Sequence, residues 1–207
     1  MHARVTRMKS DPAKVDQLVQ DLKAEMLPLF EKQPGYLGTI SSANRQTGEG
    51  ATTTYWDSME NLKASEAALF AARDKFASDK GAELLSFHRC EVAVLQRKGD
   101  PQAGRHIRVT TLSGIDPAKI EDGIRRFRDE VAPLAISQPG CRAAVLLVDR
   151  EQNTSFAISA WDTAEQRDAS DAVLRPQREA AASALGGKAE TMHAETTYAD
   201  LKAPVGN

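Results

Sequence analysis

The feature that most constrains the fold of this chain is an internal repeat. Gln33-Pro34-Gly35 recurs 105 residues later as Gln138-Pro139-Gly140, and Asp11-Pro12-Ala13-Lys14 recurs at the same offset as Asp116-Pro117-Ala118-Lys119. Matches that keep one register over this distance indicate a tandem duplication, in which each copy forms one supersecondary unit. The same offset also pairs Glu25 with Glu130, Pro28 with Pro133, Arg45 with Arg150, Trp56-Asp57 with Trp161-Asp162, Ala64-Ser65 with Ala169-Ser170, and His88 with His193.

The duplication decides how the chain is divided into domains. A length of 207 residues alone allows one large domain or two small ones. The repeat predicts a first copy at 1–95, a second copy at 106–199 and a tail at 200–207. The stretch 96–105 contains glycine and proline and has no hydrophobic periodicity, which is typical of a linker.

Each half is expected to fold as strand, helix, strand, strand, helix, strand. The first strand leads to Asp11-Pro12 or Asp116-Pro117, where the aspartate suits an N-cap and the proline suits the first helical position. Apolar residues then recur at helical spacing until the Pro-Gly pair, and a hairpin follows. Asp57-x-x-Glu60 and Asp162-x-x-Glu165 resemble capping boxes that open the second helix. The predicted strands are 3–8, 36–42, 51–56 and 85–95, then 107–112, 141–148, 155–161 and 191–198.

This order of elements is the split βαβ, or ferredoxin-like, module, in which two helices cover one face of a four-stranded antiparallel sheet. A half of this size cannot leave the other, apolar face of its sheet in water. The predicted fold class is therefore α+β, with two tandem ferredoxin-like (βαββαβ) repeats forming an intramolecular dimeric α/β barrel. Such a chain is a pseudo-dimer in one polypeptide, and whether it pairs further as a homodimer stays open.

Charge and cysteine content exclude several classes of protein. The 27 Lys+Arg and 29 Asp+Glu residues give a net charge of −2, so we expect no nucleic-acid partner. No apolar stretch approaches the roughly 20 residues of a spanning helix, so we expect no membrane partner. Cys90 and Cys141 are too few for a disulfide framework and lie in no metal-binding motif. They predict a cytoplasmic protein without a metal site.

Strand alternation predicts which side chains share a face of the sheet. In the second half, the small residues Ala157 and Ser159 alternate with the apolar Phe156 and Ile158. We expect the apolar set to meet the helices and the small set to face the barrel interior, leaving room for a ligand beside Trp161. The alternative is that each tryptophan only fills the core at a strand end. The predicted substrate-binding residues are Trp56, Trp161, Thr52, Thr54 and Ser159.

Each half resembles the antibiotic-biosynthesis monooxygenase (ABM) family of the dimeric α/β-barrel superfamily. The resemblance lies in the Pro-Gly pair, the hairpin, and a tryptophan before an acidic helix start, in Tyr55-Trp56-Asp57-Ser58-Met59-Glu60 and Ala160-Trp161-Asp162-Thr163-Ala164-Glu165. It covers nearly all of both halves. It implies a cofactor-independent monooxygenase for a small aromatic molecule, a quinol or polyketide-like compound, with the tryptophans lining the pocket. Fold alone does not fix that function.

Other site residues of the family are replaced in this chain. In its quinol monooxygenases, an Asn four residues before the tryptophan and a Tyr six residues after it help to bind substrate. This chain has Thr52 and Leu62 in the first half, and Ala157 and Arg167 in the second. The haem-degrading branch needs an Asn on the first strand and a Trp and a His on the second helix, and both halves lack them. These losses favour the alternative function, a non-catalytic ligand-binding or structural barrel. Haem binding is the third hypothesis.

His88 and His193, both predicted on a last strand, are the candidate catalytic residues. A neutral imidazole there would accept a phenolic proton, as an oxygenase without a cofactor requires. A single strand histidine is more often a structural or an exposed side chain. The polar Thr52-Thr53-Thr54-Tyr55 differs from Phe156-Ala157-Ile158-Ser159, which predicts that the two pockets differ.

Overall fold

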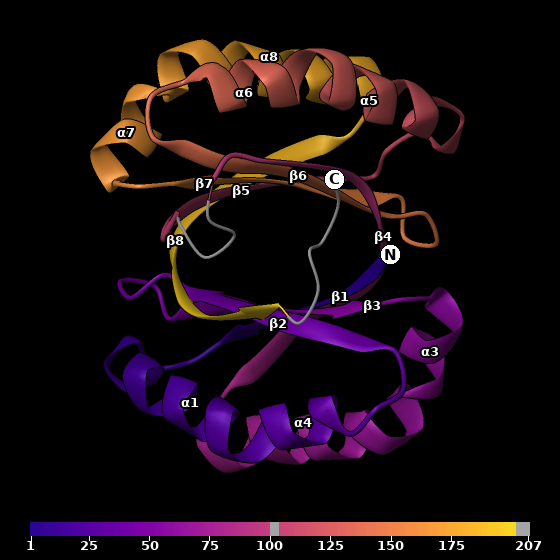
Figure 1. Cartoon of the computed structure of the whole chain (residues 1–207), viewed down its shortest axis with the longest axis vertical. Coiled ribbons are helices and arrows are strands. Elements are labelled where there is room, and N and C mark those ends of the chain that lie inside the picture. Colours follow the sequence, from indigo (N-terminus) through magenta and orange to yellow (C-terminus); the bar gives the residue numbers. More distant parts are fainter. Residues whose placement is uncertain (100–103, 202–207) are drawn as a thin grey trace. The chain divides into compact units, whose positions relative to one another are not determined.

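The computed structural model describes residues 1–99 and 104–201 of the chain (Figure 1). The linker expected at 96–105 and the tail expected at 200–207 therefore lie partly outside the described residues. Within the described ranges, none of the helices has the length and apolar character needed to cross a membrane.

Both halves contain the predicted series of elements, and the last strand of each is longer than expected. The first half comprises β1 (His2–Lys9), η1 (Pro12–Lys14), α1 (Val15–Asp21), η2 (Leu22–Met26), α2 (Leu27–Glu31), β2 (Tyr36–Ala43), β3 (Glu49–Trp56), α3 (Met59–Ala64), α4 (Glu66–Lys80) and β4 (Glu83–Arg97). The second comprises β5 (His106–Ser113), η3 (Pro117–Lys119), α5 (Ile120–Arg126), η4 (Phe127–Val131), α6 (Ala132–Ser137), β6 (Cys141–Asp149), β7 (Thr154–Trp161), α7 (Ala164–Ala169), α8 (Asp171–Leu185) and β8 (Lys188–Leu201).

The strands pair as an antiparallel sheet in each half. In the first half β1 pairs with β3 and β4, and β2 pairs with β3. In the second half β5 pairs with β7 and β8, and β6 pairs with β7. The hydrogen-bonded strand order is β1-β3-β2-β8-β5-β7-β6-β4, which closes as a barrel. The predicted fold class, two fused ferredoxin-like repeats with a barrel sheet, is thus confirmed.

The two long strands belong to both compact units of the chain. The first unit consists of Met1–Glu91 with residues 196–201, and the second unit consists of Val92–Glu195. Strand β4 therefore begins in the first unit and ends in the second, while β8 does the reverse. Each unit in this way completes its sheet with a segment from the other half of the sequence.

Side-chain caps fix where the helices begin. Asp11 and Asp116 accept hydrogen bonds from the backbone N–H groups two residues later, at 2.9 and 3.0 Å, as predicted. The second helix of each half begins one residue later than its predicted capping box. Its caps are Ser58 and Thr163, whose hydroxyl groups accept the N–H three residues on. The assignment of Asp57 as the cap is wrong because the serine hydroxyl takes this role.

A π-helical turn interrupts the first long helix at the same place in both halves, at η2 and η4. In η2 the N–H of Leu27 donates to the carbonyl of Leu22, five residues back. Pro28 and Pro133 follow these turns. A proline has no N–H for the regular bond, and its ring clashes with the carbonyl four residues earlier. The repeated prolines therefore account for the repeated change of pitch.

The repeated Pro-Gly pair has a steric cause. Gly35 and Gly140 adopt φ values of 74° and 75°, in the left-handed region that favours glycine. A Cβ atom on Gly35 would collide with the Asp57 side chain, and one on Gly140 would collide with Gln166. The carbonyl of Gly35 also accepts the N–H of Asp57 at 2.9 Å. Glycine at this position thus lets the chain pass close to the start of the next helix.

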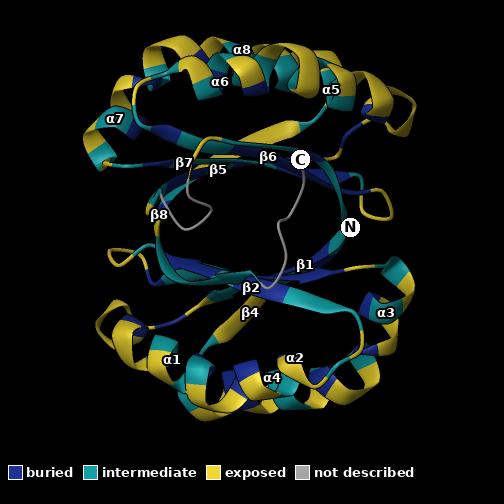
Figure 2. Cartoon of the chain, in the orientation of Figure 1, coloured by how far each residue is buried: buried dark blue, intermediate teal, exposed yellow. Residues whose placement is uncertain are grey.

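The helices of each unit cover one face of its sheet and turn their exposed residues away from it (Figure 2). In the first unit Trp56 packs with helix residues such as Leu22 and Phe76. In the second unit Trp161 packs with Ile120 and Leu174. These tryptophans are fully buried.

The expected orientation of the small and polar strand residues is wrong. Thr52 and Thr54 share a cavity wall with residues of the helices, as does Ala157 in the second unit. The bulky apolar residues of the long helices pack over this face of the sheet, and small strand side chains leave room for them. Phe156 lies on the other face and is buried there.

Candidate functional site

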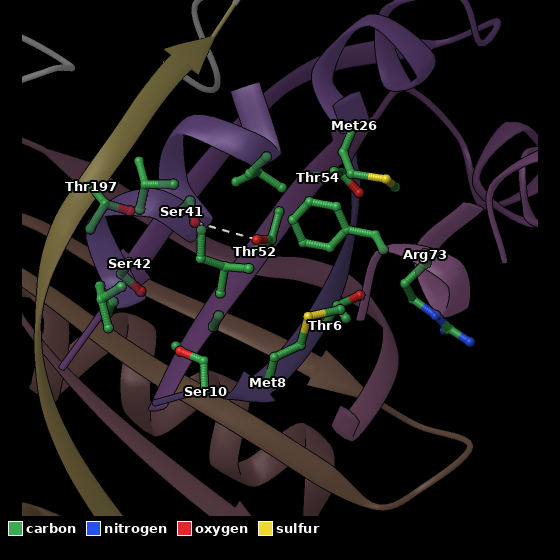
Figure 3. Close-up of a pocket in the computed structure, with 18 of the residues that line it drawn as sticks. Thr6, Met8, Ser10, Met26, Ser41, Ser42, Thr52, Thr54, Arg73 and Thr197 are labelled. Atoms are coloured by element: carbon green, nitrogen blue, oxygen red, sulfur yellow. Dashed lines mark hydrogen bonds between the residues drawn. The ribbon is translucent and has the colours of Figure 1, made fainter. Parts of the chain in front are cut away.

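The first unit encloses a cavity of about 90 Å³ between its helices and its sheet (Figure 3). Its wall is predominantly apolar, and the π-helical turn contributes Leu22 and Met26 to it. Polar side chains enter from the strands. The lining residues are Arg4, Thr6, Met8, Ser10, Val15, Leu18, Val19, Leu22, Met26, Phe30, Ser41, Ser42, Ala43, Gly48, Gly50, Ala51, Thr52, Thr54, Leu69, Phe70, Arg73, Phe76 and Thr197.

Arg4 on β1 is the buried cation of this cavity. Its Nη2 donates to the Leu62 carbonyl and to the Ser65 hydroxyl, both at 2.6 Å. Its guanidinium carbon lies 5.1 Å from the centroid of the Trp56 ring, a cation–π distance. Burial lowers the pKa of Arg4 to about 10, although the carboxylate of Glu66, 4.0 Å away, opposes this shift. Arg4 is therefore charged at neutral pH.

Two polar atoms at the cavity have no protein partner. The Nε atom of Arg4 and the hydroxyl oxygen of Thr197 are buried without a hydrogen bond. An unpaired buried donor costs about 1–3 kcal/mol, more when it is charged. A ligand oxygen that reaches either atom would satisfy it. Ser41 and Thr52 already bond to each other at 3.3 Å, as the dashed line in Figure 3 shows.

The predicted ligand-contacting residues of the first half divide into two groups. Thr52 and Thr54 line the cavity. Trp56 is not among the described lining residues, but it supports two of them. Its indole N–H donates to the Thr54 hydroxyl at 3.0 Å, and its ring lies beneath Arg4. The tryptophan thus holds Thr54 and Arg4 in place without being one of the described lining residues itself.

The second unit repeats this arrangement around Arg108. The indole N–H of Trp161 donates to the Ser159 hydroxyl at 2.9 Å, and Arg108 donates to Ser170 at 3.0 Å and to the carbonyl of Arg167. Arg108 and Ser159 line a cavity of about 40 Å³. Burial lowers the pKa of Arg108, and the nearby Arg178 adds to the effect.

The two candidate histidines are not equivalent in the structure. Arg4 pairs across the sheet with Arg89, whereas Arg108 pairs with His193. His88 pairs with Val5, between two cavity-lining residues of β1, so strand alternation turns it to the other face. On the last strand of each half, the residue structurally equivalent to His193 is therefore Arg89, which lies 104 and not 105 residues earlier.

His193 lies on the helix-covered face of the second unit, outside the described cavity linings. Its Nδ1 is 3.6 Å from Asp168, and Arg108 Nε donates to its Nε2 at 3.5 Å. Burial lowers the pKa of His193, and the charges of Arg167 and Arg108 lower it further, against the opposing effect of Asp168. These effects favour the neutral imidazole.

Sequence reasoning missed Arg4 and Arg108, although both occupy the same place on a first strand. They are 104 residues apart, one fewer than the offset of the other matches, because the second half has one more residue before Asp116. A comparison at a single offset does not align them. Within the described ranges, His, Cys, Asp and Glu side chains form no group of three that could hold a metal ion.

Comparison with known proteins adds sequence relatives and similar structures. No family model matches the chain. It is 26% identical to the uncharacterized protein Rv2558 of Mycobacterium tuberculosis H37Rv, over 99% of this chain and 86% of that protein. It is 23% identical to Rv2557 of the same organism, over 79% of this chain and 72% of that protein.

Solved structures match nearly the whole chain. An anthrone oxidase-like protein superimposes with a TM-score of 0.70 at 17% identity, covering 97% of this chain and 93% of that one. A ferredoxin-fold protein of Listeria monocytogenes, described as related to antibiotic biosynthesis monooxygenases, gives 0.53 at 9% identity, with 95% of both chains covered. A monooxygenase-like protein of Listeria innocua gives 0.55 at 10% identity, covering 94% and 93%. The chain therefore has the ferredoxin-like barrel fold of the antibiotic-biosynthesis-monooxygenase-like proteins, with both repeats in one polypeptide.

Proposed function

We propose that this protein is a cofactor-independent monooxygenase that oxidises a small aromatic quinol in the cavity of the first unit. The observation that carries the proposal is the buried Arg4 guanidinium, whose Nε has no partner in a mostly apolar cavity. The names of the similar structures, monooxygenase-like and anthrone oxidase-like, support oxygen chemistry on an aromatic compound.

The size of the cavity favours a substrate with one ring. At about 90 Å³ it is smaller than the roughly 150 Å³ cavity that binds benzene in an engineered protein. A single ring therefore fits only when neighbouring side chains move. Met8 and Met26 line the cavity, and methionine side chains adapt their shape at low cost.

Arg4 would act by stabilising the ionised substrate. A positive charge within hydrogen-bond distance of a phenol lowers the phenol pKa, and low surrounding polarity strengthens the effect. The phenolate is rich in electrons and can pass them from its ring to O₂. One oxygen atom then enters the ring and the other leaves as water, so that quinol and O₂ give hydroxyquinone and H₂O.

The roles of His88 and His193 as bases stay predictions. Neither is among the described residues that line the first-unit cavity. With Arg4 lowering the substrate pKa, the phenolic proton can leave to water instead. Replacing each histidine by alanine tests these roles. If the histidine is the base of the reaction, the variant should lose most of its turnover.

The test is oxygen uptake with methylhydroquinone, corrected for autoxidation with heat-denatured protein. Wild-type protein should consume one O₂ per quinol and form the hydroxyquinone. Arg4→Met should lower the rate at pH 7 by at least about tenfold, equivalent to 1.4 kcal/mol. The matched Arg108→Met variant, in the second unit, should retain the rate.

A pH profile separates the chemical role of Arg4 from a structural one. Without the guanidinium, the substrate must ionise at or above its solution pKa of about 10, the value of a simple phenol such as tyrosine. The rate of Arg4→Met should therefore rise with pH through that range. An unchanged profile would contradict the role of Arg4. No uptake by the wild type would favour the alternative, a non-catalytic ligand-binding barrel.

A further inference from the structure

We propose that the second unit contains a separate binding site for an apolar carboxylate. The site is a cavity of about 270 Å³ between the sheet and the helical segments α5, η4 and α8. It lies apart from the first-unit cavity in the chain, since every described residue that lines it belongs to the second unit. The proposal does not depend on oxygenase activity.

This cavity is larger than the first-unit cavity because smaller residues replace larger ones at equivalent positions of the repeat. At the 105-residue offset, Phe76 of the first cavity corresponds to Ala181 of the second, and Met26 corresponds to Val131. Replacing a large core residue by a small one leaves space that the surrounding structure fills only in part. The volume of about 270 Å³ exceeds the roughly 150 Å³ that holds benzene, so two fused rings are a suitable size.

Two buried guanidinium atoms supply the polar part of the site. The Nε of Arg126 and the Nη1 of Arg178 are buried without a hydrogen bond, and both arginines line the cavity. Arg126 Nη2 donates to Gln177 at 3.1 Å, which holds this side chain against α8. Gln177 precedes Arg178 in the chain, and both arginines line one cavity, so they offer two donors for the two oxygens of a carboxylate.

The surrounding charges select a monoanion over a dianion such as phosphate. Arg178 is already paired with Asp171, and Arg126 Nε lies 3.5 Å from a carboxylate oxygen of Glu130. These acids cancel most of the positive charge but leave the two N–H groups without a hydrogen bond. Two further charged residues line the cavity, Lys119, which donates to the Ala184 carbonyl, and Asp122, which is paired with Arg125. The remaining wall is largely aliphatic, with Ile120, Leu146 and similar residues. A flat apolar acid therefore fits both the charge and the lining.

The experiment is calorimetric titration of the full-length protein with 2-naphthoate, and with 2-naphthalenemethanol as the uncharged analogue. Wild-type protein should bind one naphthoate. Ala181→Phe, which copies Phe76 of the first unit, should weaken this binding at least tenfold. The matched control Ser41→Leu, which copies Leu146 into the first cavity, should leave it unchanged. If Ala181→Phe fails to fold, Val131→Met provides the same test.

Arg126→Met then tests the polar contact. It should weaken naphthoate binding by about tenfold and leave binding of the alcohol within twofold, because only the carboxylate uses the guanidinium. Absence of saturable naphthoate binding would overturn the proposal. So would equal losses in Ala181→Phe and Ser41→Leu, or equal losses of acid and alcohol in Arg126→Met.

Discussion

Arg4 shows how much of the site depends on a single side chain that the sequence does not reveal. An arginine within a short alternating strand is expected to point to water, yet Arg4 is only 4% exposed. It is stable there because the Leu62 carbonyl, the Ser65 hydroxyl and the Trp56 ring replace its hydration. These groups come from other elements, so only the fold brings them to the arginine. Strand alternation predicts that Thr52 and Thr54 share a strand face with Trp56, but it does not predict that this face meets the helices.

At the same scale, His193 should make stability depend on pH. Its pKa is lowered in the folded protein by burial and by Arg167 and Arg108, whereas an unfolded histidine titrates near 6.5. The unfolded state therefore binds the proton first, and the free energy of unfolding falls as pH drops below that value. Urea unfolding at pH 7.5 and 5.5 should show a smaller difference for His193→Gln than for wild type. An equal or larger difference would refute this assignment.

The two cysteines should be inert in the native protein. Cys90 and Cys141 are 0% and 2% exposed, and burial raises the pKa of Cys141 to about 11. The thiolate is the reactive form, so modification by Ellman's reagent at pH 8 should be slow until the protein is unfolded in urea. Rapid reaction of either thiol without denaturant would contradict the burial of both side chains.

At the scale of elements, most helix and strand positions could be predicted from the repeat, from alternation and from Asp-Pro and Pro-Gly signals. The π-helical turns could not, because Pro28 within an apolar helical pattern is compatible with a kink, a break or a wider turn. The face of each strand that meets the helices was also mispredicted. That choice depends on how bulky the opposing helix is, which strand alternation does not specify.

The N-cap of the second helix can be tested by comparing the stability of Ser58 and Asp57 variants. Ser58→Ala should lower the free energy of unfolding by about 1 kcal/mol, because it leaves a helical N–H without its acceptor. Asp57→Ala should cost less, since this exposed side chain bonds the Asn61 amide and Ser58, and the Ser58 hydroxyl caps the helix. Thr163→Ala in the other half should match Ser58→Ala. Chemical denaturation checks the order, and a larger loss for Asp57→Ala would contradict it.

At the scale of the whole molecule, the shared strands predict joint unfolding of the two units. Strands β4 and β8 each supply residues to both units, so neither unit keeps its full sheet without the other half of the sequence. Trp56 and Trp161 report on one unit each. In Trp161→Phe and Trp56→Phe, fluorescence and far-UV circular dichroism should therefore give the same urea midpoint. A midpoint for one tryptophan that precedes the loss of ellipticity would contradict joint unfolding.

Duplication with divergence explains why the two units contain unlike cavities, of about 90 Å³ in the first and about 270 and 40 Å³ in the second. The cavities of about 90 and 270 Å³ are each built on a π-helical turn and an arginine of the second helix, Arg73 or Arg178, and the side chains between them set the volume. The central claim is that the first-unit cavity holds a quinol against Arg4. A crystal structure of the anaerobic complex with methylhydroquinone tests this most directly. We expect the ring in the first-unit cavity with one oxygen about 2.7–3.2 Å from Arg4 Nε. A ring bound elsewhere, with the Arg4 cavity empty, would contradict it.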